Sequence, residues 1–152
     1  MIDLAHHYGT DRKKVSYQDI KAVIEKDKVD VRKGDLVLFH TGYGQMLMDA
    51  KGEPTKELLF GTGCVLDGRD QELLDWVTES GIVALISDNY AVEVGFLAGG
   101  AFLTIWLLTL GFVPFQAFPE PNPPADPTKP FAALGLHEHC LFKLGCYLGE
   151  IW

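Results

Sequence analysis

Two short apolar segments, each enclosed by turn residues, constrain the fold of this chain more than any other feature. Leu36–His40 follows a Gly-Asp turn and is ended by the Thr-Gly-Tyr-Gly stretch at residues 41–44. Residues 82–86 form a second such run, closed by Ser87, Asp88 and Asn89. Apolar runs of this length between turn residues predict buried strands.

Two helices are predicted to alternate with these strands. Ser16 opens a capping box ahead of apolar residues at helical intervals, which predicts a helix over about residues 17–26. Residues 69–79 show a second amphipathic pattern, with Asp67 as its expected N-cap and Gly81 as its stop. Strands alternating with helices are typical of an α/β fold.

The last part of the sequence predicts a short helix ended by Gly145 and then a strand. On this helix His137 is expected to share the apolar stripe with Leu141 and Leu144. Glu150 is expected on the strand face that also carries apolar residues. An ionisable group on a buried surface needs a partner or a metal, so this histidine and carboxylate suggest half of a metal site.

Length and composition suit one folded domain. The chain has 152 residues, 47% of them apolar, so a single domain over residues 1–152 with a real core is expected. The net charge of -8 argues against nucleic acid and anionic membrane surfaces as partners. Cys64, Cys140 and Cys146 offer no disulfide framework, and residues 1–10 lack an apolar run, so a cytoplasmic protein is expected.

One uncharged stretch interrupts this picture. Residues 94–119 contain no charged side chain, and residues 96–113 are apolar enough to resemble a membrane span. Interspersed glycines, Pro114 and the lack of closely flanking Lys or Arg favour a buried hairpin or helix in the core or at an oligomer interface. Residues 119–130 contain six prolines and predict an extended surface loop. About residues 95–130 therefore form an atypical insert in the single domain.

Residues able to carry chemistry follow the two predicted strands. His40 and Thr41 come at the end of the first strand, and Asp88, Asn89 and Glu93 come after the second. In α/β sheets, groups that bind ligands gather at the carboxyl ends of strands. Turns rich in Asp, Asn and Gly are also common for structural reasons, so polar turns are the alternative interpretation.

Four segments resemble the cyclase family of metal-dependent hydrolases, which includes kynurenine formamidase and isatin hydrolase. Residues 34–43 (GDLVLFHTGY) resemble the family's GD-apolar-RTGW segment, and residues 87–93 (SDNYAVE) resemble its DNxAVE segment. Residues 136–152 resemble its LH-x-x-x-L…GE-x-W ending, and residues 1–5 (MIDLA) resemble its LLDVA strand. The four segments occur in the family's order and cover most of the chain outside the insert.

This resemblance implies a swivelling β/β/α fold and an arylformamidase-like hydrolysis of an amide or lactone-like C–N or C–O bond in a small molecule. The reaction would use one or two divalent ions, usually zinc or manganese, to polarise the carbonyl and lower the pKa of a bound water. His137 and Glu150 match the family's C-terminal metal ligands. Imidazole and carboxylate groups suit both metals.

The remaining ligands and the catalytic histidine of the family lie in an HxGTHxDxPxH motif upstream of the LLDVA strand. This chain begins at that strand and stops just after Glu150, so it resembles a member shortened at both ends, and no catalytic residue is assigned. Residues 7–11 (HYGTD) imitate part of the motif, but they follow the strand and are interpreted as a chance match. An active site would need completion by another chain or by His6, His7 or Asp11.

Two alternatives stay open. The chain could be a non-catalytic homologue, a scaffold or interaction subunit in which His137 and Glu150 form a hydrogen-bonded pair without metal. A small structural zinc site could instead draw on His137, His139, Cys140, Cys146 and Glu150, although their spacing fits no standard pattern. In each case open sheet edges predict a homo-oligomer.

Overall fold

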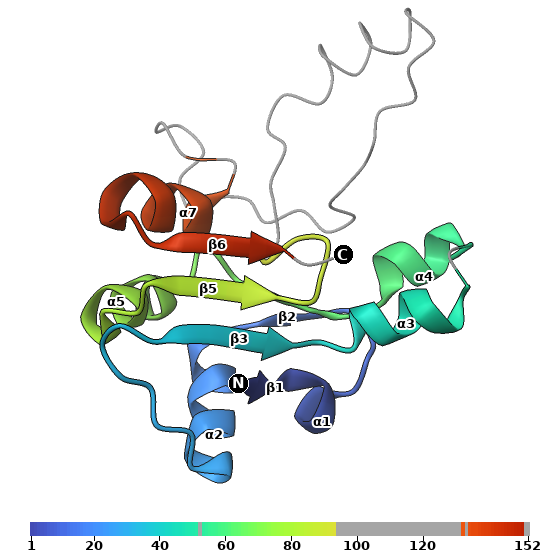
Figure 1. The fold of residues 1–152 in the computed structure, drawn as a ribbon, viewed down its shortest axis with the longest axis horizontal. Coiled ribbons are helices and arrows are strands. Elements are labelled where there is room, and N and C mark those ends of the chain that lie inside the picture. The colour runs from blue at the N-terminus through green and yellow to red at the C-terminus, as the bar shows by residue number, and fades with distance from the viewer. Residues whose placement is uncertain (52, 94–131, 133, 151–152) are drawn as a thin grey trace, which may run out of the picture.

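The computed structural model of this chain describes residues 1–51, 53–93, 132 and 134–150 (Figure 1). Its strands form two parallel sheets, which confirms the α/β class. The larger sheet has the order β1 (Ile2–Asp3), β3 (Leu36–His40), β5 (Ala84–Ser87) and β6 (Tyr147–Glu150). The smaller sheet pairs β2 (Lys13–Val15) with β4 (Cys64–Leu66).

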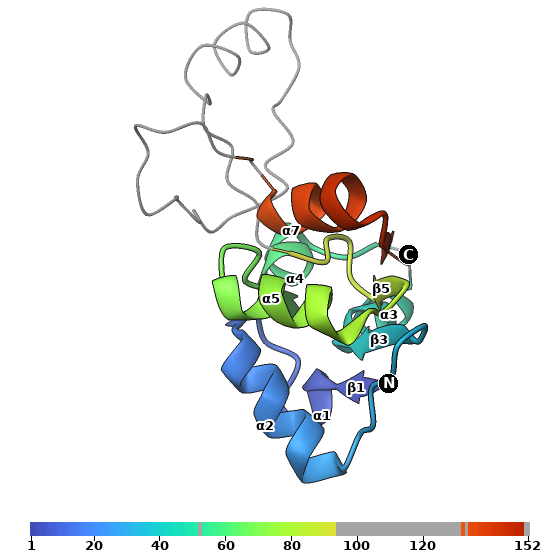
Figure 2. The same ribbon diagram turned by 90° about the vertical axis from the view of Figure 1, so that its left-hand side faces the viewer.

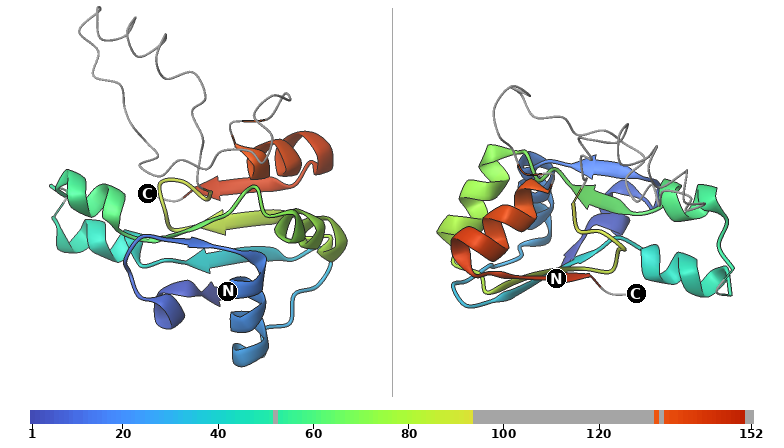
Figure 3. Two further views of the ribbon diagram at one scale, coloured as in Figure 1. Left: turned by 180° about the vertical axis from the view of Figure 1, so that it is seen from behind. Right: turned by 90° about the horizontal axis from the view of Figure 1, so that it is seen from above.

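The helices gather on one side and at one end of the larger sheet. They are α1 (Leu4–Tyr8), α2 (Tyr17–Asp27), α3 (Tyr43–Asp49), α4 (Lys56–Gly61), α5 (Gln71–Ser80), α7 (Gly135–His137) and the π-helix η1 (Glu138–Leu144). Figure 2 shows α2, α5 and α7 in a row along one face of the sheet. Helices α3 and α4 lie beyond the carboxyl ends of β3 and β5, and the smaller sheet lies on the same side as α5 and α7 (Figure 3).

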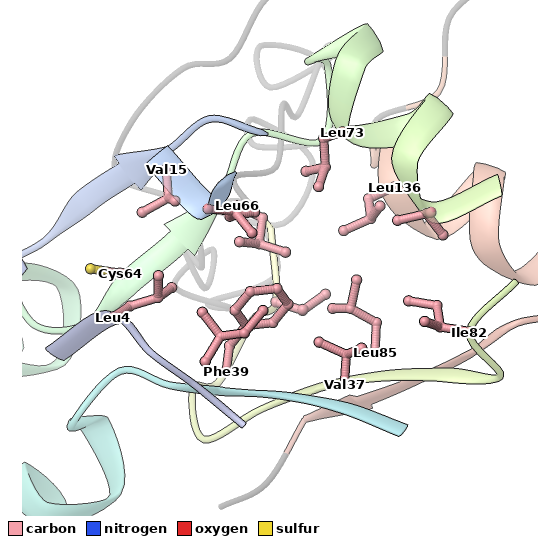
Figure 4. Packing of buried hydrophobic residues seen from close by; sticks show 14 of the residues in the cluster. Leu4, Val15, Val37, Phe39, Cys64, Leu66, Leu73, Ile82, Leu85 and Leu136 are labelled. Atoms are coloured by element: carbon pink, nitrogen blue, oxygen red, sulfur yellow. The ribbon is translucent and has the colours of Figure 1, made fainter. Parts of the chain in front are cut away.

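The core lies between the two sheets and the helices. Figure 4 shows Val37, Phe39 and Leu85 of the larger sheet pointing toward Leu66 of the smaller sheet and Leu136 of α7, and all five are buried. The intervening residues of β3, Leu36 and Leu38, are exposed, because side chains alternate between the faces of a strand. Among the described elements, none covers that opposite face (Figure 3).

The predicted strand over Leu36–His40 and the helix after Ser16 are confirmed. The Ser16 side chain accepts the backbone N–H of Asp19, and the Asp19 side chain accepts the backbone N–H of Ser16, so the capping box forms. The other N-cap prediction is wrong, since Asp70 caps α5. Asp67 instead accepts the N–H of Arg69 in the preceding turn and pairs with Lys14.

The C-terminal helix ends at Gly145, with φ of 68°, as predicted. The predicted stripe of His137, Leu141 and Leu144 is wrong: Leu141 and Leu144 are 46% and 40% exposed. The winding changes from α to π at Glu138, so the α-helical spacing on which this stripe was predicted does not hold across the segment. Leu136 and Cys140 are the buried residues of this segment instead.

Across the described ranges, no helix combines the length and apolar character needed to cross a membrane. The uncharged stretch at residues 94–119 and the proline-rich segment at residues 119–130 lie outside the described residues. The predictions of a buried hairpin or helix and of an extended loop, which fall on them, therefore stay predictions.

Candidate functional site

The carboxyl ends of the four strands of the larger sheet meet along one edge. Asp3 pairs with His40 in register, and Ser87 pairs with both Phe39 and Glu150. Because all these strands are parallel, their last residues and the loops that follow them lie at the same edge. This edge carries both loops that the sequence singled out.

The most enclosed ionisable group at this edge is Glu93. Its carboxylate is 1% exposed and accepts the backbone N–H groups of Leu136 and His137 at 3.0 and 2.8 Å. Nδ1 of His137 lies 2.7 Å from Oε1 of the same carboxylate. The hydrogen bond with Glu93 raises the pKa of His137 above its ordinary value, although burial of the ring acts in the opposite direction.

Close glycine contacts make room for this carboxylate. A Cβ atom at Gly68 would overlap Oε2 of Glu93, and a Cβ atom at Gly135 would overlap the carbonyl oxygen of Gly68. Segments far apart in the sequence therefore approach one another at backbone distance around Glu93. The carboxylate is held by this packing as well as by its three hydrogen bonds.

The hydrogen bond to Glu93 orients the imidazole of His137. When Nδ1 donates to the carboxylate, Nε2 of the neutral ring keeps its lone pair. Nε2 lies 3.7 Å from Oε1 of Glu150, and this oxygen accepts the N–H of Val92 at 3.1 Å. Two atoms bound to one zinc ion at about 2.1 Å each lie about 3.4 Å apart in tetrahedral geometry, so this separation fits a shared metal ion.

Both side chains of this candidate metal pair, His137 and Glu150, are partly open. The exposed fraction is 26% for the His137 side chain and 31% for that of Glu150. The prediction that Glu150 points at buried surface is therefore wrong. Strand β6 is an edge strand of the described sheet, so its end is not covered on both sides. An ion or small molecule could reach the pair from that side.

The candidate metal pair has no third ligand among the described residues. Within them, no group of three or more His, Cys, Asp or Glu residues is arranged to hold a metal ion. His7 cannot complete the pair in this arrangement, because its Nε2 lies 2.8 Å from the Asp27 carboxylate on α2. Asp11 faces a different space, the hollow described below.

The structural zinc alternative finds no support among the described side chains. Cys140 and Cys146 are buried free thiols, and burial raises the pKa of Cys140 to about 12. Neither thiol belongs to a group of three or more His, Cys, Asp or Glu residues that could hold a metal ion in the described part of the chain. His139 forms a hydrogen bond with another element, since its Nε2 lies 2.8 Å from Oγ1 of Thr78 on α5.

Asp88 and Asn89 have structural roles, as the alternative interpretation of polar turns expects. The Asp88 carboxylate accepts the backbone N–H groups of Thr41 and Gly42 at 2.6 and 3.1 Å, which joins the loops after β3 and β5. The Asn89 amide donates to the carbonyl oxygen of Cys64 in the smaller sheet. These contacts place the segment that ends in Glu93.

A hollow of about 720 Å³ lies at the end of β3, on the sheet edge that also carries the candidate metal pair. It is lined by His40, Asp11 and residues of α3 and α4. Nδ1 of His40 lies 2.8 Å from Oδ1 of Asp3, which also accepts the N–H of His6. Burial opposes ionisation of Asp3, but these hydrogen bonds outweigh it and lower its pKa. His6 thus takes part here through its backbone.

Sequence reasoning placed Glu93 among the residues able to carry chemistry but assigned it neither a role nor a partner. It stood in the segment SDNYAVE without an assigned role, although a carboxylate directly after apolar residues was a signal of burial with a partner. The partner lies 44 residues away in the sequence. Nothing in local sequence patterns connects the two positions.

Fold and site together define an α/β protein with parallel sheets, whose sheet edge carries a histidine held between two carboxylates. The model of the family described as "Putative cyclase" matches residues 1–94, more than half of the chain, and the chain belongs to the cyclase family. No curated protein and no solved structure gives a significant match. The matched residues include Glu93, whereas His137 and Glu150 lie beyond them.

Proposed function

We propose that this chain is a metal-dependent hydrolase of the cyclase family that acts on an amide or lactone-like bond of a small molecule, in the manner of kynurenine formamidases. Zinc or manganese would be held by His137 and Glu150, on a swivelling β/β/α scaffold. The observation that supports this most is the placement of His137 between Glu93 and Glu150. The family match supports the scaffold over residues 1–94.

Each of the three residues has a distinct task in this proposal. Glu93 orients the imidazole through Nδ1, as carboxylates commonly do behind metal-binding histidines. Nε2 of His137 and the carboxylate of Glu150 are the two groups left to bind the ion. A bound ion would polarise the substrate carbonyl and lower the pKa of its water ligand.

A catalytic zinc site commonly uses three protein ligands and leaves one position for water. The described residues supply two of them, so the proposal requires a further ligand from outside the described part of the chain or from another chain. The raised pKa of His137 adds a second requirement. A proton on Nε2 competes with the metal, so metal affinity should increase as the pH rises through the pKa of this histidine.

Metal binding and activity test this function. The purified chain is titrated with zinc and with manganese, and heat of binding, Tm and hydrolysis of an N-formyl aryl amide are measured. We expect metal to raise the Tm of the wild-type chain and of His139→Ala, which changes a neighbouring histidine bonded to Thr78. We expect no such rise in His137→Ala or Glu150→Gln. Equal metal effects in all four proteins, or none in the wild type, would contradict the proposal.

A non-catalytic role is the second candidate, supported by the completeness of the Glu93–His137 hydrogen bonds without a metal. In this case His137→Ala lowers the Tm and no metal effect exists to lose. A homo-oligomer is expected under both candidate functions, and it stays a prediction. Sedimentation of the purified chain would test it.

A further inference from the structure

Arg12 carries an enclosed positive charge just before strand β2. Its backbone N–H donates to the carbonyl oxygen of Gly61, which fixes the start of the side chain. Nε, Nη1 and Nη2 are all shielded from solvent, and none has a hydrogen-bond partner in the described structure. A guanidinium has five N–H donors and keeps its charge at every physiological pH. A buried guanidinium without an anion destabilises the folded state, so we expect an anionic group to bind it.

One aromatic ring lies against this guanidinium, and two further aromatic rings pack on that ring. Cζ of Arg12 lies over the ring of Tyr90, 5.4 Å from the centroid. The ring of Tyr43 lies 5.4 Å from that of Tyr90, and the ring of Phe60 meets it edge-on at 6.3 Å. A cation over an aromatic face is attracted to it, but the N–H donors point outward from the edge of the guanidinium plane. The contact with Tyr90 therefore offsets only part of the cost.

The nearby described groups cannot neutralise Arg12. The Asp88 carboxylate is occupied by the backbone N–H groups of Thr41 and Gly42. Asp11, the preceding residue, is exposed and lines the separate hollow beside α3. Burial, with a smaller effect of Tyr90, raises the pKa of Tyr43 to about 12, so Tyr43 remains a neutral phenol.

We propose that Arg12 anchors a binding site for a small aromatic carboxylate. The planar fork of a guanidinium matches the two oxygens of a carboxylate in a bidentate pair. One carboxylate cancels the single charge of Arg12, whereas a phosphate dianion would leave an excess negative charge in an enclosed place. The rings of Tyr43, Phe60 and Tyr90 suit a flat apolar body attached to that carboxylate.

This site is connected to the candidate metal pair through one short segment. Tyr90 and Glu93 are three residues apart, a span of at most about 10 Å. Val92, in the same segment, donates its N–H to Glu150. A role for Arg12 in holding the substrate rests on the proposed hydrolase function, but binding of a carboxylate does not. The test below therefore uses no metal and no turnover.

Benzoate is the probe, with benzamide as its neutral counterpart of the same shape and inorganic phosphate as a competing anion. Binding is measured on the full chain by calorimetry and by the rise in Tm. We expect benzoate to bind the wild type and Arg32→Met, in which the lost arginine is exposed and bonded to Asp30. We expect Arg12→Met to weaken benzoate binding about tenfold or more, and Arg12→Lys to weaken it less.

The Tm of Arg12→Met without ligand distinguishes two explanations of the buried charge. Either a bound ligand pairs with Arg12, or a carboxylate of the same chain does. If the charge awaits a ligand, its replacement by an apolar side chain should leave this Tm unchanged or raise it. A large fall in Tm would overturn the proposal, because the guanidinium would then have a partner inside the chain. Glu120 and Asp126 are the carboxylates of residues 94–131, so an equal fall in the Glu120→Gln, Asp126→Asn double variant would identify that partner. Equal binding of benzoate and benzamide, tighter binding of phosphate, or no binding would also refute it.

Discussion

Nδ1 of His137 lies 2.7 Å from Oε1 of Glu93, and that carboxylate is almost completely enclosed. The contact joins the loop after β5 to the short helix α7, 44 residues further along the chain. It fixes which nitrogen of the imidazole faces Glu150. The orientation of the candidate metal ligand is thus decided by a residue on a different element.

Removal of the Glu93 carboxylate should destabilise the fold. Glu93→Ala leaves the backbone N–H groups of Leu136 and His137 and the His137 ring without their acceptor, so we expect a loss of about 3 kcal/mol in the free energy of unfolding. Urea unfolding measures the change. Glu138→Ala is the matched control, since Glu138 is 46% exposed and its ion pair with Lys143 spans 3.7 Å. A loss of less than about 0.5 kcal/mol is expected there. Equal losses in the two variants would contradict the assigned role of Glu93.

Stability should depend on pH through His137. Its pKa is raised in the folded chain above the ordinary value of 6.5. A raised histidine pKa means that the folded state binds the proton more tightly than the unfolded state. The resulting stabilisation is fully present below about pH 6.5 and is lost as the pH rises through the folded-state pKa. Urea unfolding of the metal-free chain at a series of pH values should show this decline.

Two variants test the origin of this decline. In His137→Gln the decline should shrink, because the titrating group is gone. In Glu93→Gln the pKa of His137, followed by its ring proton shifts in NMR, should fall back toward 6.5, because the hydrogen-bonded negative charge is removed. An unchanged His137 pKa in Glu93→Gln would show that another group raises it.

The link between the loops after β3 and β5 should be measurable at Asp88. Asp88→Ala removes a carboxylate that accepts the N–H groups of Thr41 and Gly42, so we expect a loss of about 2 kcal/mol in the free energy of unfolding. Asp75→Ala serves as the control, because in the described part of the chain Asp75 accepts a hydrogen bond from the exposed Gln71 side chain one turn away. Its expected effect is below about 0.5 kcal/mol. Comparable losses in the two variants would mean that the loops are held by other contacts.

Much of the local structure follows from the sequence alone. The capping box at Ser16, the strand over Leu36–His40 and the helix stops at Gly81 and Gly145 were all predicted, and all are present. Each depends on interactions within a few residues, such as a side chain that accepts a nearby N–H or a glycine that takes up positive φ. The family resemblance over residues 1–93 likewise lies in contiguous segments, and the family match confirms it.

Two predictions about the C-terminal segment were wrong. One assumed the periodicity of an α-helix, and the other assumed that a neighbouring element buries Glu150 on β6. Leu141 and Leu144 of η1 are exposed, and Glu150 at the end of the edge strand β6 is partly exposed. Both outcomes depend on which elements pack nearby, and a sequence pattern does not contain that information.

The sequence by itself determined the α/β class and the helix limits at Ser16, Gly81 and Gly145, and it predicts His137 and Glu150 as candidate ligands. Tertiary structure alone decided that Glu93 orients His137 and that the shielded guanidinium of Arg12 lies over Tyr90 with no hydrogen-bond partner among the described residues. The physical reason is that the cost of a buried charge depends on its surroundings in space. Those surroundings come from segments that are distant along the chain and meet only after the parallel sheets have formed.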